Sequence, residues 1–191
     1  RVSDQSQRVG VRFQNVTIPQ GATITSAYLQ FVSGSGGTQS SEVKLSIKGE
    51  DKDNALPFVE TNENIKDRWD NFDTNASQSW TINTNWTDKI RYQSPDVGNI
   101  VQEIVNRSGW ASGNAMVLML SRSDKDNNRA VYSYDGSPSH VVLGGGVPHS
   151  TNYAPTLIIT YDGVVGGGSG TCTTDIRVNA NSDDADDRED G

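Results

Sequence analysis

Two short acidic runs contain the side chains of this chain that are best suited to bind a metal ion. Residues 50–54 (EDKDN) and 124–128 (DKDNN) each gather carboxylate and amide oxygens into one short turn. Calcium binds roughly six to eight such oxygens, usually in loops. Neither run has the glycine that an EF-hand needs at its sixth position, so a solvated acidic turn is the alternative interpretation. The candidate calcium ligands are Glu50, Asp51, Asp53, Asp124, Asp126 and Asn128.

An acidic tail is a third candidate site. Residues 183–190 hold six acids against the single Arg188, so they account for much of the formal net charge of −8. Runs of like charge are usually solvated. Calcium bound by Asp183, Asp184 and Asp186 would instead join one copy of the chain to the next. Calcium is the only cofactor that the sequence indicates.

The residues do not indicate enzymatic chemistry. The histidines are His140 and His149, and neither lies in a G-x-S-x-G or H-E-x-x-H motif. Glycosidases use a pair of carboxylates, but acids are so frequent in this sequence that no pair stands out. We therefore expect a protein that is not an enzyme.

Tryptophans are the candidate residues for binding carbohydrate, because a flat ring can stack on a sugar. Trp80 lies beside apolar strand positions and Trp110 lies where a predicted helix stops, so both are expected in the core. Trp69 and Trp86 lie in segments rich in Asn, Asp and Thr. They are the two candidate carbohydrate-binding residues.

The composition favours a loop-rich extracellular domain. The 191 residues include 19 glycines, one cysteine (Cys172) and 33% hydrophobic residues. Nucleic-acid binding is not expected, because Lys and Arg do not cluster, and no run approaches the ~18 apolar residues of a membrane span. We expect a secreted or surface-displayed protein. Its N-x-S/T sequons would permit glycosylation at Asn15, Asn75, Asn85 and Asn106.

Hydrophobic periodicity predicts an all-β domain with one helix. Alternating apolar and polar residues indicate strands, and the nearly continuous apolar run 115–122 indicates the most central one. Ser94 and Pro95 suit the first positions of a helix that ends by Gly109. The apolar stripe of that helix is Val97, Ile100, Val101, Ile104 and Val105. The predicted strands are 9–16, 22–32, 42–50, 79–82, 115–122, 130–135 and 156–161.

The C-terminal residues 171–191 follow a Gly-rich spacer and begin with a strand pattern. Asp175, Arg177 and Asn179 alternate with apolar neighbours, which is typical of a half-buried strand. The apolar partners in this pattern are Ile176, Val178 and Ala180. A chain that starts within a sheet and finishes on such a strand suggests that another copy completes its edges.

Three motifs resemble the disaggregatase-related β-sandwich domain of large secreted surface proteins. They are VGVRF at 9–13 with VTIPQGATITSAYLQF at 16–31, IVQEIVNRSGWASGNA at 100–115, and APTLIITY at 154–161. The resemblance covers about residues 8–162 and implies a surface β-sandwich, some relatives of which are assigned as carbohydrate-binding modules. It also implies that a strand like 176–178, followed by an acidic stretch like 182–187, opens the domain. Here that element follows the sandwich.

We therefore expect a jelly-roll-like antiparallel β-sandwich at residues 1–163, a hinge at 164–170 and an extended arm at 171–191. The leading hypothesis is a non-enzymatic subunit of an extracellular filament or tandem surface array. The arm strand 174–181 would leave its own domain and add to the edge formed by Val9, Val11 and Phe13 of the next copy. Head-to-tail donation of this kind does not close on itself, so it builds a homopolymer.

The alternative hypothesis is a carbohydrate-binding module of a multidomain secreted protein. The arm would then be the start of the next repeat, and polysaccharide would be the partner. The two hypotheses are compatible, since an adhesive filament can also bind polysaccharide.

Overall fold

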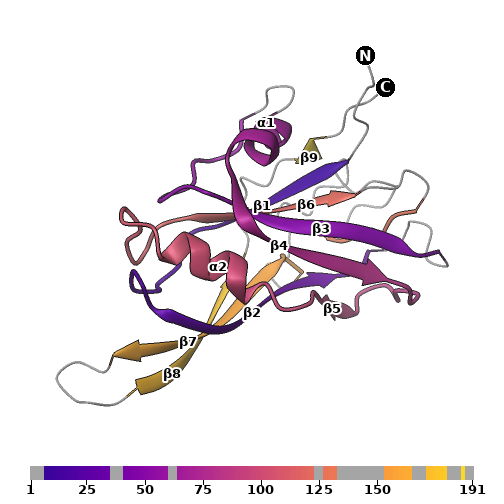
Figure 1. Ribbon diagram of the computed structural model, residues 1–191. Coiled ribbons are helices and arrows are strands. Elements are labelled where there is room, and N and C mark those ends of the chain that lie inside the picture. The colour runs from indigo at the N-terminus through magenta and orange to yellow at the C-terminus, as the bar shows by residue number, and fades with distance from the viewer. Residues whose placement is uncertain are drawn as a thin grey trace.

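Two antiparallel sheets packed face to face form the body of the protein in a computed structural model (Figure 1). The structure describes residues 7–34, 41–59, 64–122, 127–132, 153–164, 171–179 and 186–187. Sheet A has the order β4 (Asp73–Ile82), β3 (Val43–Glu50), β6 (Met116–Arg122), β1 (Arg8–Phe13) and β9 (Asp186–Asp187). Sheet B has the order β5 (Arg91–Gln93), β2 (Thr23–Val32), β7 (Thr156–Val164) and β8 (Thr171–Asn179). The predicted all-β sandwich is confirmed.

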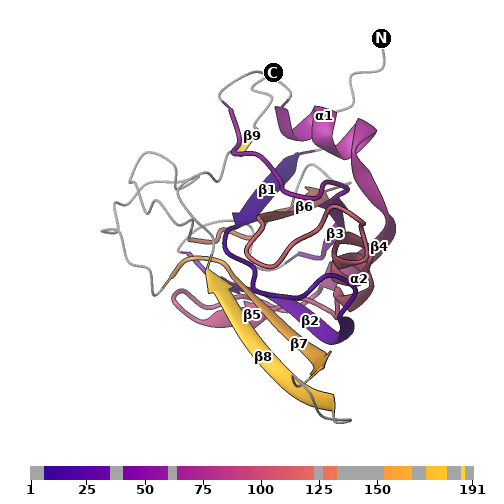
Figure 2. The ribbon, with the colours of Figure 1, turned by 90° about the vertical axis from the view of Figure 1, so that its left-hand side faces the viewer.

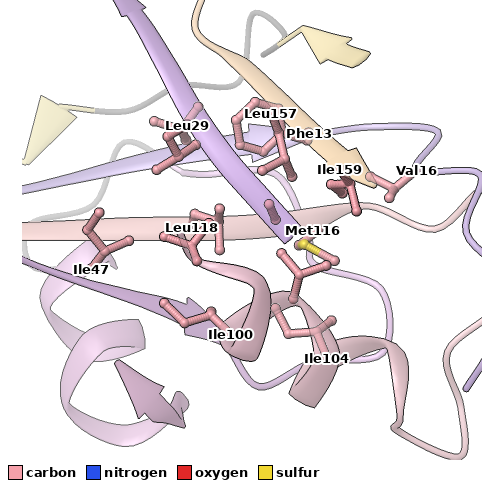
Figure 3. Packing of buried hydrophobic residues seen from close by; sticks show 14 of the residues in the cluster. Phe13, Val16, Leu29, Ile47, Ile100, Ile104, Met116, Leu118, Leu157 and Ile159 are labelled. Atoms are coloured by element: carbon pink, nitrogen blue, oxygen red, sulfur yellow. The ribbon is translucent and has the colours of Figure 1, made fainter. Parts of the chain in front are cut away.

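The core lies between the two sheets and takes side chains from both of them (Figure 3). Phe13, Ile47 and Leu118 come from sheet A, and Leu29 and Ile159 face them from sheet B. All five side chains are fully buried. Burial of this apolar surface is the main favourable contribution to folding, at ~25 cal/mol per Å².

Strand β6 is the centre of sheet A, as its apolar run predicts. It pairs with β1 on one side and with β3 on the other. Met116 and Leu118 face the main core, while Val117 and Met119 are buried on the opposite face of the same sheet. A strand covered on both faces has no need for polar alternation, which explains the continuous apolar run.

A second layer covers the outer face of sheet A, and the sequence did not predict it. Helix α1 (Asn64–Asn71) and the segment 51–59, here called the strap, lie over β1 and β6 (Figure 2). Ile65 and Ala55 are buried against Val117 and Met119. The expectation of a single helix is therefore wrong. Helix α1 has eight residues, of which only Ile65 and Arg68 are buried. Its sequence therefore shows no helical periodicity of apolar residues.

Helix α2 (Gly98–Val105) has the predicted apolar stripe but begins later than predicted. Ser94 is not its N-cap, because residues 94–97 run beside β2 before the helix begins. Ser94 N–H donates to Leu29 O (2.8 Å) and Val97 N–H donates to Ala27 O (2.8 Å). The first helical N–H, from Gly98, donates to Asp96 Oδ1 (2.8 Å). Five of the eight helical residues are buried, so the stripe lies on the core as expected.

The structure differs from the predicted strands at several places. The predicted short strand 79–82 is the end of the ten-residue β4, whose first half is too polar to show alternation. The short strand β5 was not predicted. In the predicted strand 130–135, Val131 makes an isolated bridge to Ser33 and residues 133–135 lie outside the described ranges. In the described part of the chain, no helix is long and apolar enough to cross a membrane.

The contact between α2 and β3 leads to a first prediction. A Cβ atom at Gly49 would lie 2.7 Å from Ile104 Cδ1 and 2.9 Å from Ile100 Cγ2, both on the buried face of α2. Gly49→Ala should therefore lower the free energy of unfolding by about 1–3 kcal/mol, because the helix has to move away from the sheet. Urea unfolding followed by tryptophan fluorescence measures this change.

Gly34→Ala is the matched control. A Cβ atom at Gly34 meets its nearest neighbour at 3.8 Å, which is ordinary van der Waals contact. This variant should unfold within about 0.5 kcal/mol of the unchanged protein. Equal stabilities for Gly49→Ala and Gly34→Ala would show that α2 does not pack closely on β3.

Candidate functional site

The C-terminal arm adds an edge strand to sheet B. Strand β8 pairs antiparallel with β7 along its whole length, from Thr156 opposite Asn179 to Val164 opposite Thr171. Gly163 and Val164 pair with β8 but not with β2, so the end of this hairpin extends beyond the rest of the sheet (Figure 1). The arm strand is therefore held by a complete β ladder.

The alternating pattern of the arm corresponds to alternating burial on β8. Ile176 and Val178 are half-buried and pack against the main core, while Arg177 between them is exposed. In the register, Ile176 lies opposite the fully buried Ile159, and Val178 lies opposite the fully buried Leu157. The arm thus contributes apolar side chains to the core as well as backbone hydrogen bonds.

The arm then reaches the other sheet. In β9, Asp186 lies opposite Val9 and Asp187 lies opposite Arg8 of β1. Strands β8 and β9 occupy the same side of the sandwich, one at the edge of each sheet, and we call this the arm side. The arm therefore lies along the whole of β7 and beside the first two residues of β1.

These positions differ from the predicted pairing of arm and acceptor edge. The sequence analysis assigned the arm strand to the edge at Val9, Val11 and Phe13, whereas β8 pairs with β7 and only β9 lies beside β1. Val11 and Phe13 are buried and pair with β6 on their other side. Asp175 and Asn179 are part of the β8 ladder, opposite Thr160 and Thr156, and Ala180 lies outside the described residues. Among the described residues, the edge that holds the arm strand is β7.

Helix α2 and the segment before it occupy the opposite side of the sandwich, which we call the helix side. There the edge of β2 is satisfied by side chains. Ser94 Oγ accepts a hydrogen bond from Leu29 N–H (3.0 Å), and Asp96 Oδ1 accepts one from Ala27 N–H (2.9 Å). Gln102 accepts from Ile24 N–H (2.8 Å) and donates to Ala22 O (2.9 Å). The β2 edge is thus protected from Ala22 to Leu29.

The next residue of α2 does the same for sheet A. The two carboxylate oxygens of Glu103 accept hydrogen bonds from Asn75 N–H and Ala76 N–H of β4, both at 2.8 Å. Gln102 and Glu103 therefore point to the edges of different sheets from adjacent positions of one helix. In the sequence, Gln102 and Glu103 are a polar pair between the apolar stripe residues Val101 and Ile104, but this pattern alone does not show that they cap sheet edges.

The candidate calcium ligands of the first acidic run are bound to arginines. The buried Glu50 carboxylate accepts from Arg68 Nη1 (2.9 Å), and Arg68 also donates to Leu56 O and Pro57 O in the strap. Burial raises the pKa of the Glu50 carboxyl above its ordinary value, and the neighbouring Arg68 opposes that rise. Glu50 thus fixes the strap to the end of β3.

Asp51 and Asp53 bind the segment that follows α2. Arg107 donates from Nε to Asp53 Oδ1 (2.7 Å) and from Nη1 to Asp51 Oδ1. The hydrogen bond to Asp51 is the largest cause that raises the pKa of the Arg107 guanidinium. No group of three or more His, Cys, Asp or Glu side chains is arranged to hold a metal ion within the described ranges.

Of the other calcium candidates, the structure describes Asn128 and Asp186. Asn128 lies in the described segment 127–132, next to Arg129 in the chain and close to Arg122. Asp186 is part of β9. Asp124, Asp126, Asp183 and Asp184 lie outside the described residues. Calcium binding stays a prediction for this protein.

The two tryptophans assigned to carbohydrate differ in exposure. Trp86 is not an exposed platform: it is 7% exposed and its ring stacks on Tyr92 with centroids 4.3 Å apart. Its polar neighbours in the sequence hid the fact that it completes an aromatic cluster with Trp80 at 5.8 Å. Trp69 is half-buried and packs against the cluster of Ala55, Ile65, Val117 and Met119, with Lys48 Nζ 5.2 Å from its ring centroid. Trp80 and Trp110 are buried, as predicted.

An apolar cleft of about 140 Å³ lies beside the same aromatic cluster, between the sheets. Phe31, Trp80 and Trp86 line it. At its rim, Arg129 donates to the carbonyls of Ser41 (2.9 Å) and Thr84 (3.0 Å), and burial lowers the pKa of Arg129. Arg129 thereby ties together two of the connections around the cleft.

The asparagines of the four sequons are all exposed on the surface. Asn75 Nδ2 donates to Glu103 Oε1 (3.2 Å), and Asn106 Oδ1 accepts from Gln102 Nε2 (2.9 Å). Asn15 has a positive φ of 55°, and Asn85 lies in the loop between β4 and β5. Their exposure suits glycosylation, which stays a prediction.

A scan against protein-family models gave no match, and searches of curated proteins and of solved structures gave none either. The resemblance to the disaggregatase-related domain therefore stays a prediction. The function is argued below from the geometry of the arm side and the helix side.

The helix side gives a second prediction. Glu103→Ala should leave Asn75 N–H and Ala76 N–H without their acceptors, so the free energy of unfolding should fall by about 1 kcal/mol. Amide hydrogen exchange at these two residues should become faster, while exchange within β6 stays unchanged. Glu42→Ala is the matched control, since Glu42 is exposed and its carboxylate pairs with the exposed Lys44. Unchanged exchange at Ala76 in Glu103→Ala would exclude the edge role of Glu103.

The buried pair at Glu50 gives a third prediction, on pH. Because the pKa of Glu50 is raised in the folded protein, the folded state binds more protons than the unfolded state just above pH 4.5, its ordinary value. Stability should therefore rise as the pH falls into that range, and it should stop rising once the unfolded state is protonated as well. The contribution is measured against Glu50→Gln, which has no group to titrate here.

Denaturant unfolding of both proteins between pH 4 and 8 checks this sign. The difference in unfolding free energy between the unchanged protein and Glu50→Gln should grow in favour of the unchanged protein on acidification. A difference that shrinks as the pH falls would mean that Arg68 lowers the pKa of Glu50 more than burial raises it.

Proposed function

We propose that this protein is a non-enzymatic structural subunit of an extracellular filament or surface array, and that its copies are joined by exchange of the C-terminal arm. In the exchanged state, β8 of one copy lies beside β7 of the next. The observation that carries the proposal is that, among the described residues, strands β8 and β9 of the arm form the outer strands of both sheets on one side of the sandwich. Calcium at the acidic end of the arm is part of the proposal as an added link between copies.

The contrast between the two sides of the sandwich supports the proposal. On the helix side, the β2 edge and the start of the β4 edge, at Asn75 and Ala76, are capped by side chains of α2 and of the residues before it. On the arm side, the edges of β7 and β1 have as their neighbours only the strands of the arm, within the described part of the chain. Removal of the arm would leave a long unpaired edge and a gap in the core, which is an acceptor for a strand from another chain.

The position of the arm in the sequence also supports exchange. The arm joins the body through residues 165–170, which are rich in glycine. Six residues span at most about 20 Å when extended. A connection of this length and composition is suited to making a hairpin within one chain or to crossing to a neighbouring chain.

The energetics set the condition for polymerisation. Exchange replaces each contact of the arm by the same contact in another copy, so the strand interface itself favours neither state. A tethered arm acts at an effective concentration on the order of millimolar. Exchange should therefore require high protein concentration, and it should be slow because the β7–β8 ladder must open first.

The fourth prediction uses the native cysteine to detect exchange. The register places the Cα atom of Gly163 opposite that of Cys172, so Gly163→Cys provides a second cysteine across the β7–β8 ladder. Oxidation of dilute monomer should close a disulfide within one chain and prevent fibre growth. Oxidation of grown fibres should instead give a ladder of covalent oligomers on a non-reducing gel. Reduction should restore fibre growth to the blocked monomer.

Variants of the arm test the same idea by side chain. Ile176→Asp combined with Val178→Asp should abolish fibres seen by negative-stain electron microscopy, because both residues pack on the core. Arg177→Gln, on the exposed face between them, should leave fibre formation intact. Monomers under every condition of concentration and time, or fibres whose oxidation yields only intramolecular disulfides, would overturn arm exchange. Fibres that persist in chelator would exclude calcium from the joint.

A further inference from the structure

Strand β4 forms the edge of sheet A on the helix side, and no described strand lies on its outer side. It has ten residues, whereas the edge strands β5 and β9 have three and two. From Thr74 to Ile82 its sequence contains no charged residue, no proline and no glycine. Long edge strands are usually protected by such residues, because an unpaired edge invites pairing with another chain.

Only one end of this edge is protected by the helix. Glu103 occupies Asn75 N–H and Ala76 N–H. At the other end, the chain leaves the sheet after Ile82 and places Trp86 5.8 Å from Trp80. The segment 77–82 lies between these two points, and we call it the free β4 edge. A segment of six residues is long enough for a stable pairing of two strands.

The side chains of the free β4 edge leave room for another strand. Ser77, Ser79 and Thr81 are exposed on the outer face, where they are small and polar. Trp80 and Ile82 point into the core and are buried. A row of serines crosses sheet A at this point, because Ser46 of β3 lies opposite Ser79 of β4 on one side and opposite Ser121 of β6 on the other. The large side chains on this face, Lys44 and Lys48, belong to β3, one strand further in, opposite Thr81 and Ser77.

We infer that the free β4 edge pairs antiparallel with the same edge of a second copy. The charge distribution selects this partner. The chain carries a net charge of −8, so copies repel each other, but the free β4 edge brings no charge to a contact. Strand β8, the other long edge, carries the charged residues Asp175 and Arg177 and belongs to the arm that the proposed exchange uses. A two-fold pairing of β4 with β4 brings together only the uncharged residues 77–82.

This contact is independent of arm exchange. Strands β4 and β9 are at opposite edges of sheet A, so the arm side stays accessible when two β4 edges pair. A two-fold contact joins two copies and then closes. Head-to-tail filaments joined by their arms would therefore associate laterally in pairs through β4, and a chain that does not exchange its arm would form dimers.

The fifth prediction tests the β4 contact in a chain that cannot exchange. Sedimentation equilibrium of the oxidised Gly163→Cys protein should show monomers and dimers. Ser79→Lys in the same background should raise the dimer dissociation constant roughly tenfold or more, because two lysines are brought together at the pairing. Ser46→Lys is the matched control: it adds the same charge to the same face, one strand further in, and should leave the constant unchanged. If the disulfide does not form, the unchanged protein serves as the background.

Two outcomes would overturn the β4 contact. One is a monomer at all concentrations in the exchange-blocked protein. The other is a dimer that Ser79→Lys and Ser46→Lys weaken equally, which would place the contact elsewhere. Neither outcome bears on arm exchange, which is read from the disulfide pattern of fibres. In fibres, Ser79→Lys should change paired filaments into single filaments in electron micrographs, while filament length stays the same.

Discussion

Every peptide group at the edge of a sheet needs a hydrogen-bonding partner, and in this protein each of the two long sides of the sandwich meets that need in a different way. On the helix side, side chains from 94–103 replace a neighbouring strand along much of β2 and at the start of β4. On the arm side, the neighbours are true strands, β8 and β9. The first arrangement is fixed by the middle of the chain. The second depends on a segment near its end that is joined by six residues.

The helix side works because α2 is held in place independently of the edges that it caps. Its buried face packs closely on Gly49 of β3, where a Cβ atom would clash with Ile100 and Ile104. Beyond the helix, Arg107 joins Asp51 and Asp53, and Trp110 Nε1 donates to Ile18 O (3.0 Å). Asp51 and Asp53, which the sequence suggests as calcium ligands, accept hydrogen bonds from Arg107 in this structure. Because each of these carboxylates already has a cationic partner, they stabilise the connections between layers.

The sequence predicted the elements whose pattern is long and one-sided, and it failed where tertiary contacts decide. Strands β2, β3 and β7 and the stripe of α2 were readable because one face of each is buried, and β6 was readable because both of its faces are buried. Helix α1 has too few buried residues to give a period, and Trp86 is buried in spite of polar neighbours. For the candidate site, alternation identified Ile176 and Val178 as inward-facing. It could not choose between the edges of β1 and β7, because either edge would take the same pattern.

The same reasoning links the stability of one subunit to its assembly. Ile176 and Val178 face core residues Ile159 and Leu157, so a sandwich without an arm loses core packing as well as edge hydrogen bonds. Under the proposed exchange, each copy offers one acceptor site for an arm, formed by β7 and β1, and this site would hold either its own arm or that of a neighbour. In a closed monomer each acceptor site holds its own arm, whereas in an open chain of copies only the terminal site would lack one. The penalty of that single unfilled site would be shared over the whole polymer, so the proposed exchange would favour long filaments over short ones.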